Sequence, residues 1–296
     1  MDFQTASKIS ENEARDYLEK LRWDGDPFCP HCGSLSVGKL NGKATRPGVY
    51  KCKDKGCRKQ FTVTVGTIFE GSHIGLREWV MAFCLVCSSK KGISALQLQR
   101  MLGLKSYKSA WHMAHRIRHA MQNGPIKGLL RGAVEVDETW IGGRIKGPGK
   151  GPRIANKTAV VALIERNGDM RTRVMKRVTH KNLREAVNDM VCPSATLYTD
   201  EHPAYKKAGK RFRKHEAVKH TAGEYARGDA HCNTAESYFA LLKRGVHGVF
   251  HHVGEGHLQR YCDEFSFRWN HRDRTDAFRT EAALKLAPGC RLRYAN

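Results

Sequence analysis

The residues of this chain best suited to chemistry are three carboxylates, Asp137, Asp200 and Glu236. There are 62 residues between the first two and 35 between the last two. Carboxylates are the hard oxygen ligands that Mg²⁺ prefers, and two such ions about 3.5–4 Å apart can neutralise the attacking and leaving oxygens of a phosphodiester. A single acidic residue in a basic chain is usually a surface ion-pair partner. The hypothesis of two Mg²⁺ or Mn²⁺ ions therefore requires that the fold bring all three together.

Two predicted strands would position the aspartates. Asp137 lies in an alternating segment, 133–141, in which Glu135 shares its face and Val134 and Val136 face inward. The apolar segment 195–199 runs directly into Asp200. This places Asp200 at the carboxyl end of a strand, where ligand sites of α/β sheets gather. Both aspartates are therefore expected in one sheet.

The surrounding pattern predicts a mixed α/β sheet with flanking helices. Asn167-Gly168 is a strong hairpin turn signal between two apolar segments. A hairpin followed by a β-α-β crossover places helices on the faces of the sheet. The expected strands are 133–141, 158–165, 171–178, 195–199 and 216–218, and the expected helices are 183–191, 234–244 and 255–269. Glu236 lies on the second of these helices, one turn after Asn233 and two turns before Lys243.

A second constellation consists of four cysteines in two close pairs, separated by 19 residues. Two knuckles of thiolates joined by a loop are typical of a tetrahedral Zn²⁺ site. The region is too small to fold by apolar burial, so metal binding is expected to supply its folding energy. Because four thiolates leave no open position, the zinc would be structural. The predicted ligands are Cys29, Cys32, Cys52 and Cys57.

Between these two constellations the sequence is helical. A short amphipathic helix is ended by Gly103, and a second helix follows, whose expected outer face carries Lys108, Arg116 and three histidines. The pattern resembles a helix-turn-helix DNA reader, with an ordinary bundle bearing a basic face as the alternative. Cys84 and Cys87 also have zinc-knuckle spacing, but they lie in an apolar helical run and are predicted to be buried thiols.

The charge of the whole chain indicates a polyanionic partner. There are 52 Lys and Arg against 29 Asp and Glu, a net charge of +23. Basic residues gather in a Gly-rich loop, 142–153, and around Lys206 and Lys207. The longest apolar run, 80–87, is far below the roughly 20 residues of a membrane span. No secretory leader is recognisable at 1–10, so an intracellular location is expected.

The predicted domain organisation has five parts. Ser10 and Glu13 form a capping box that begins the first helix, and Gly124-Pro125 marks a linker. The expected parts are an N-terminal helix (1–22), a zinc ribbon (23–65), a helical DNA-binding segment (66–124), an α/β catalytic domain (130–272) and a C-terminal tail without a motif (273–296).

Several strings place these features in a known setting. They include Val136-Asp-Glu-Thr-Trp-Ile-Gly-Gly, Tyr198-Thr-Asp-Glu-His-Pro-Ala-Tyr and His231-Cys-Asn-Thr-Ala-Glu-Ser-Tyr. The strings and the Asp–Asp–35–Glu spacing resemble the ribonuclease-H-like catalytic domain of DDE transposases. The similarity is to the zinc-ribbon-bearing, ISXO-like branch of bacterial insertion-sequence transposases, and it covers most of residues 25–272.

This resemblance implies metal-dependent DNA transposition in the cytoplasm, associated with the nucleoid. Asp137 would bridge two Mg²⁺ or Mn²⁺ ions, Asp200 would bind one and Glu236 the other. Some members of the branch have Asn as the third ligand, so Asn233 is an alternative. Lys243, with Arg244 beside it, would contact double-stranded DNA at the element end. Bringing two ends together implies a homo-oligomer on DNA.

Two alternatives to a transposase remain open on the sequence alone. One is a non-catalytic zinc-ribbon DNA-binding protein with a decayed core, which the loss of a carboxylate would have favoured. The other is a ribonuclease-H-like nuclease without strand transfer. All three carboxylates are present, and the zinc ribbon argues against a plain nuclease.

Overall fold

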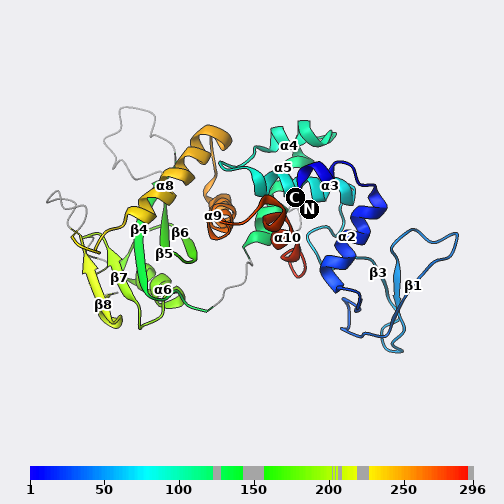
Figure 1. Cartoon of the computed structure of the whole chain (residues 1–296), viewed down its shortest axis with the longest axis horizontal. Coiled ribbons are helices and arrows are strands. Elements are labelled where there is room, and N and C mark those ends of the chain that lie inside the picture. The colour runs from blue at the N-terminus through cyan, green and yellow to red at the C-terminus, as the bar shows by residue number, and fades with distance from the viewer. Residues whose placement is uncertain are drawn as a thin grey trace. The chain divides into compact units, whose positions relative to one another are not determined.

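A computed structural model describes residues 1–122, 128–142, 157–201, 203, 205, 209–218 and 227–292 of the chain. The chain forms two compact units (Figure 1). The first, here called the ribbon–helix unit, comprises Met1–Gly124 and Asp273–Asn296, and the second, the sheet unit, is Pro125–Arg272. Each unit has a core of its own.

The ribbon–helix unit begins with two helices and a small antiparallel sheet. The helices are α1 (Phe3–Ala6) and α2 (Glu11–Trp23), and the strands pair in the order β1 (Val37–Lys39), β2 (Tyr50–Cys52) and β3 (Gln60–Phe61). The capping box of α2 is confirmed. Ser10 Oγ accepts a hydrogen bond from the Glu13 N–H, and Glu13 Oε2 accepts one from the Ser10 N–H at 2.7 Å.

Three aromatic rings join this sheet to α2. The ring centroid of Trp23 lies 5.1 Å from that of Tyr50 and 6.1 Å from that of Phe61, and the last two rings are stacked at 5.6 Å. Strands of two or three residues bury little else. The small apolar core therefore agrees with the expectation that a metal stabilises the ribbon.

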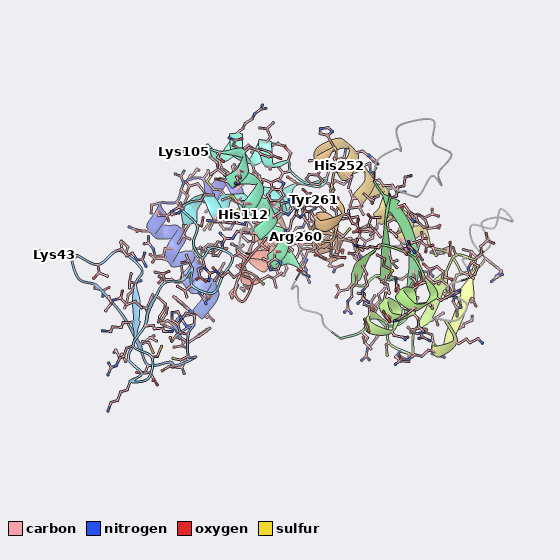
Figure 2. All side chains as sticks on the ribbon, turned by 180° about the vertical axis from the view of Figure 1, so that it is seen from behind. Lys43, Lys105, His112, His252, Arg260 and Tyr261 are labelled. Atoms are coloured by element: carbon pink, nitrogen blue, oxygen red, sulfur yellow. The ribbon has the colours of Figure 1, made fainter. Side chains whose placement is uncertain are left out.

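Three helices follow the ribbon: α3 (Leu76–Ser88), α4 (Ala95–Leu102) and α5 (Tyr107–Met121). Gly103 ends α4 in the left-handed region, with φ of 62°, and so makes the predicted turn to α5. Cys84 and Cys87 are 2% and 0% exposed on α3, which confirms that they are buried thiols. Lys105 extends outward from the turn between α4 and α5 (Figure 2).

The outer face expected for α5 is different in the structure. Lys108 is exposed, but Arg116 is only 6% exposed. The Arg116 guanidinium donates to the Glu70 carbonyl and lies 5.8 Å from the centre of the Trp79 ring. Because α3, α4 and α10 (Asp276–Lys285) all contact α5, more than its apolar stripe is covered. Arg116 therefore contributes to packing rather than to an exposed basic face.

The C-terminal region also differs from the motif-free tail predicted from the sequence. Its helix α10 packs on α3, with Thr280 and Ala283 buried. The Gly289 N–H donates to the Gly66 carbonyl at 2.8 Å, and the Ile68 N–H donates to the Ala287 carbonyl. The helix completes a core whose other residues lie about two hundred positions earlier in the sequence, so no local pattern indicates it.

The sheet unit contains the predicted mixed sheet, with strand order β6-β5-β4-β7-β8. The strands are β4 (Ala133–Ile141), β5 (Thr158–Glu165), β6 (Met170–Met175), β7 (Thr196–Thr199) and β8 (Lys214–Ala217). The first three are antiparallel neighbours, whereas β7 pairs parallel to β4, and β8 parallel to β7. Asn167 has φ of 60° in the turn between β5 and β6, as the hairpin prediction requires. This is the ribonuclease-H-like arrangement.

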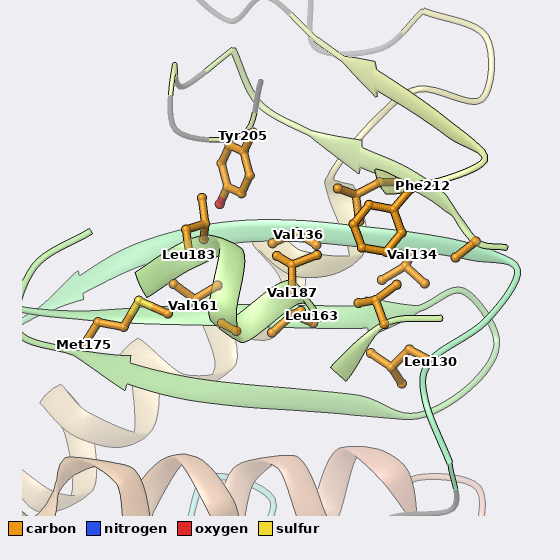
Figure 3. Close-up of a cluster of buried hydrophobic side chains, with 14 of the residues drawn as sticks. Leu130, Val134, Val136, Val161, Leu163, Met175, Leu183, Val187, Tyr205 and Phe212 are labelled. Carbon is orange, nitrogen blue, oxygen red and sulfur yellow. The ribbon is translucent and has the colours of Figure 1, made fainter. Parts of the chain in front are cut away.

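Helices cover both faces of this sheet. On one face, α6 (His180–Met190) packs Leu183 and Val187 against Val134, Val136 and their neighbours (Figure 3). On the other face lie α8 (Asn233–Gly245), the short π-helix η3 (Val246–Phe250) and α9 (Glu255–Asn270). The 3-10 turn η1 (Gly209–Arg211) precedes β8. Because both faces are covered, β4 is buried on its acidic side as well.

Among the residues that the structure describes, no helix combines the length and the apolar character needed to cross a membrane.

Candidate active site

The four ribbon cysteines converge on one point. The Sγ atoms of Cys29 and Cys57 are 3.7 Å apart, as are those of Cys32 and Cys52, and all four lie within 4.8 Å of one another. Zn–S bonds of about 2.3 Å in a tetrahedron place sulfurs about 3.8 Å apart. The donor set therefore fits a structural Zn²⁺ and leaves no position for a reactant.

The turns of the first knuckle explain how the thiols are presented. The Gly33 N–H donates to the Cys29 carbonyl at 2.8 Å, and the Cys29 N–H donates to the Ser34 carbonyl at 2.9 Å. Gly33 has φ of 78°, a conformation that side chains disfavour. These bonds close the turn that carries Cys29 and Cys32 and so place both thiols on the side of the metal position.

In the sheet unit, Asp137, Glu138 and Asp200 bring carboxylate oxygens within 4.8 Å of one another. We call these three residues the carboxylate cluster. Its geometry follows from the parallel pairing of β4 and β7, in which Val136 is opposite Thr199. The next residue of each strand is an aspartate, so Asp137 and Asp200 lie side by side at the carboxyl end of β7.

Glu236 lies beside the carboxylate cluster rather than in it. It is exposed in the first turn of α8, one turn after Asn233, which is also exposed. Among the described residues, the group within 4.8 Å contains only the cluster itself. The charge of Glu236 nevertheless contributes to the raised pKa of Asp137. The structure thus brings α8 to the edge of the cluster.

The surroundings of Asp137 and Glu138 disfavour charge on these two carboxyls. Burial raises the pKa of Asp137 to about 7, with further increases from the charges of Glu138, Asp200 and Glu236. A hydrogen bond from the Glu138 N–H at 2.7 Å acts in the opposite direction. Burial also raises the pKa of Glu138 to about 7, although donation from the Tyr205 hydroxyl lowers it. Such sites are stabilised by a bound cation.

Sequence reasoning did not select Glu138. Alternation along a strand places it opposite Asp137, with Val134 and Val136, so the two carboxylates were not expected to meet. The structure buries Glu138 to 8% exposure beside Tyr205, while Asp137 turns its Oδ1 toward the Glu138 N–H. The sequence did contain one signal for Glu138: two acidic residues, Asp137 and Glu138, are adjacent within an apolar strand of a basic chain.

The basic residues expected to bind DNA occupy different settings. Lys243 and Arg244 are exposed in the last turn of α8, two turns after Glu236. Lys210, Arg211 and Arg213 are exposed between β7 and β8. Lys206, Lys207 and nearly all of the basic loop 142–153 lie outside the described residues.

Comparisons with known proteins agree with this arrangement. Residues 129–270 match the ISXO2-like transposase domain, and residues 9–60 match the transposase zinc-ribbon domain. The chain is 30% identical over 277 residues to an uncharacterized protein in transposable element ISH50 of Halobacterium salinarum, covering 88% of this chain and 91% of that protein.

Two solved Mos1 structures are also similar to part of the chain. They are the Mos1 strand transfer complex and a pre-cleavage Mos1 transpososome. Each is 14% identical and covers 60% of this chain and 72% of the Mos1 chain, with TM-scores of 0.26 and 0.25.

A ribonuclease-H-like sheet that carries clustered carboxylates, together with a Cys₄ ribbon, defines the class of zinc-ribbon DDE transposases. Within that class, the two matched domains and the full-length relative identify the family. The chain belongs to the ISXO2-like transposases.

Proposed function

We propose that the protein binds the terminal repeats of an insertion sequence and catalyses metal-dependent DNA cleavage and strand transfer. The observation that carries this proposal is the convergence of Asp137, Glu138 and Asp200, with Glu236 at their edge, in a chain of net charge +23. Asp137, Glu138 and Asp200 would hold divalent cations, which would supply the positive charge needed between these carboxylates and the phosphates of DNA.

The proposed roles follow from position. Asp137 lies in the carboxylate cluster with Asp200, and the charge of Glu236 also acts on it. Asp137 would contact both of two Mg²⁺ or Mn²⁺ ions, while Asp200 would hold one and Glu236, with Asn233 as the alternative, the other. Bound ions would neutralise charge on the attacking and leaving oxygens of the phosphodiester. Glu138 is well placed as an additional ligand. The chain's own contribution is positioning and electrostatics, without a covalent intermediate.

We expect exposed lysine and arginine side chains to bind double-stranded DNA. Lys243 and Arg244 extend from the same helix as Glu236 and would hold phosphates of the element end near the carboxylates. Lys108 and Lys105 would contact DNA at the turn between α4 and α5, and Lys206 and Lys207, which follow Asp200 in the sequence, would contact it as well. Phosphate contacts of this kind are sequence-independent and weaken with salt. Two ends held together would require a homo-oligomer on DNA in the nucleoid.

The test uses linear DNA that carries the element end, incubated with the purified full chain and Mg²⁺. Wild-type protein should nick the end and join it to target DNA. Asp137→Ala should reduce both products by at least about 10³-fold, because the central ligand is lost, while end binding stays near wild type. The matched control is Asp189→Ala, which removes an exposed carboxylate paired with Arg173 in the same unit.

Three outcomes separate the candidate functions. Joined products that depend on Asp137 support the transposase. Cleavage without joining identifies a nuclease, and binding without cleavage identifies a DNA-binding protein. Strand transfer by Asp137→Ala at the wild-type rate would contradict the assignment of the carboxylate cluster.

A further inference from the structure

A fourth carboxylate, Glu135, is fully buried beneath the cluster and surrounded by donors. It is 0% exposed and lies on β4, two residues before Asp137. Its Oε1 accepts from Arg166 Nε at 2.8 Å and from Thr234 Oγ1 at 2.9 Å, and its Oε2 accepts from the backbone N–H groups of Thr234 and Ala235 at 2.9 and 3.2 Å. Burying a carboxylate is costly, and these hydrogen bonds offset the cost, so the position of Glu135 calls for a structural or functional reason.

Two of these partners are backbone N–H groups in the first turn of α8, which have no acceptor within the helix. The N-cap residue of the helix, Cys232, makes no side-chain capping bond. Glu135 caps the helix instead, from a strand about 100 positions earlier in the sequence. A carboxylate in this place satisfies orphan donors and interacts favourably with the helix dipole. The beginning of α8 is therefore fixed to β4.

Arg166 extends the connection to β7. Its guanidinium bonds to Glu135, donates to the His231 carbonyl at 3.0 Å, and lies 4.4 Å from the centre of the Tyr198 ring. Tyr198 is opposite Glu135 in the pairing of β4 with β7 and stands two residues before Asp200. The contacts of Glu135 thus reach all three elements that carry the proposed metal ligands: β4 with Asp137, β7 with Asp200, and α8 with Glu236.

We propose that Glu135 is a positioning residue that holds the first turn of α8 so that Glu236 can share a metal ion with Asp137. The inference rests on the proposed function and adds a residue to it. Glu236 lies in the turn that Glu135 caps, and its own N–H donates to the Cys232 carbonyl at 3.0 Å. Without the cap, the turn would fray and Glu236 would leave the edge of the cluster.

Glu135→Gln is the direct test because it keeps the shape of the side chain. In either orientation the new amide N–H₂ faces donors, so one set of bonds is lost. The probe is Mn²⁺ alone, titrated by calorimetry into the full-length protein. Wild-type protein should bind two ions in the sheet unit. In Glu135→Gln the weaker ion should bind at least about tenfold less tightly, as in Glu236→Gln, while the other is retained.

The double variant separates positioning from general damage. If Glu135 acts through Glu236, adding Glu135→Gln to Glu236→Gln should weaken Mn²⁺ binding no further. Glu264→Gln is the matched control, since Glu264 is another fully buried carboxylate of this unit and pairs with Arg268 within α9. It should lower the melting temperature but leave both ions bound. Additive losses in the double variant, or unchanged Mn²⁺ binding in Glu135→Gln, would overturn the inference.

A milder pair of variants guards against misfolding of Glu135→Gln. Thr234→Ala removes one hydroxyl donor to Glu135, whereas Thr234→Ser keeps it. The alanine variant should show part of the Mn²⁺ defect and the serine variant none, and equal behaviour of the two would count against the proposal.

Hydrogen exchange distinguishes failure of this inference from failure of the proposed function. In Glu135→Leu, which offers no acceptor in any orientation, the amides of Thr234 and Ala235 should exchange about tenfold faster than in wild-type protein, because they lose their acceptor. If wild-type protein binds no Mn²⁺, the proposed function fails and exchange alone decides whether Glu135 holds the turn. Unchanged exchange at these amides would refute the capping role.

Discussion

At the scale of single residues, the carboxylate cluster is costly to assemble. Asp137 and Glu138 are both buried enough to raise their pKa values to about 7, and Asp200 adds its charge to each. Packing a basic protein around such a site lowers its stability at neutral pH unless a cation enters. The cost is understandable if divalent ions belong there, since metal ligands must be deprotonated and binding releases protons.

The pH dependence of metal binding follows from these shifts. In the folded protein the pKa of Asp137 is about 7, above the ordinary aspartate value of 3.8. The folded protein therefore binds more protons, and without metal its stability falls as the pH rises from about 4 through 7. Mn²⁺ should raise the melting temperature more at pH 8 than at pH 6, because fewer protons must be displaced. Differential scanning fluorimetry at the two pH values measures this.

Asp137→Asn is the appropriate variant for that experiment. It removes the titrating group, so the metal-free variant should be more stable than wild type at pH 8. The expected gain in the free energy of unfolding is about 1.4 kcal/mol for each unit by which folding raises the pKa of Asp137. Its response to Mn²⁺ should also be small. Equal Mn²⁺-induced shifts at pH 6 and pH 8 in wild-type protein would contradict the assignment.

At the scale of elements, the turn between α4 and α5 depends on one glycine. Gly103 has φ of 62°, and a Cβ built there meets no atom within 4 Å. The cost of a side chain is therefore backbone strain alone. Gly103→Ala should reduce the free energy of unfolding by about 1 kcal/mol, and Gly103→Asn by less, since Asn tolerates this region.

Urea unfolding followed by circular dichroism compares the two variants. Equal stability of the alanine, asparagine and wild-type proteins would show that the turn does not depend on the left-handed conformation of Gly103. Salt-dependent DNA binding, measured on the same variants, then shows whether the orientation of α5 and Lys108 affects the affinity for DNA.

Elements whose partners are local were predictable from the sequence. Alternation gave the bounds of β4, an apolar run gave those of β5, and Asn167-Gly168 gave the connection of β5 to β6. The burial of Arg116 and the packing of α10 on α3 were not predictable, because they depend on surfaces distant in sequence. The same holds for Glu138 and Glu135, whose importance depends on Tyr205 and on the first turn of α8.

At the scale of the whole molecule, the chain divides its tasks between two units with separate cores. The ribbon–helix unit holds the cysteines, and the sheet unit holds the carboxylates. The Cys₄ spacing predicted all four cysteines that converge in the ribbon, since they lie within 29 positions of one another. The second site requires the topology of a five-stranded sheet. Strand positions and the family resemblance predicted Asp137, Asp200 and Glu236 as its carboxylates but did not predict that Glu138 lies with the two aspartates.

Separate cores imply that zinc and the metal proposed for the carboxylate cluster would act independently on stability. Cys52→Ser should remove zinc and unfold the ribbon around β1 to β3, because three short strands and the rings of Trp23, Tyr50 and Phe61 cannot replace the metal. Hydrogen exchange should then rise in residues 29–61, while exchange in β4 and β5 and the binding of Mn²⁺ remain at wild-type values. Cys192→Ser, a change to a partly exposed thiol in the sheet unit, is the control. Loss of Mn²⁺ binding in Cys52→Ser alone would show that the two sites are coupled, because an independent sheet would keep its carboxylates in place.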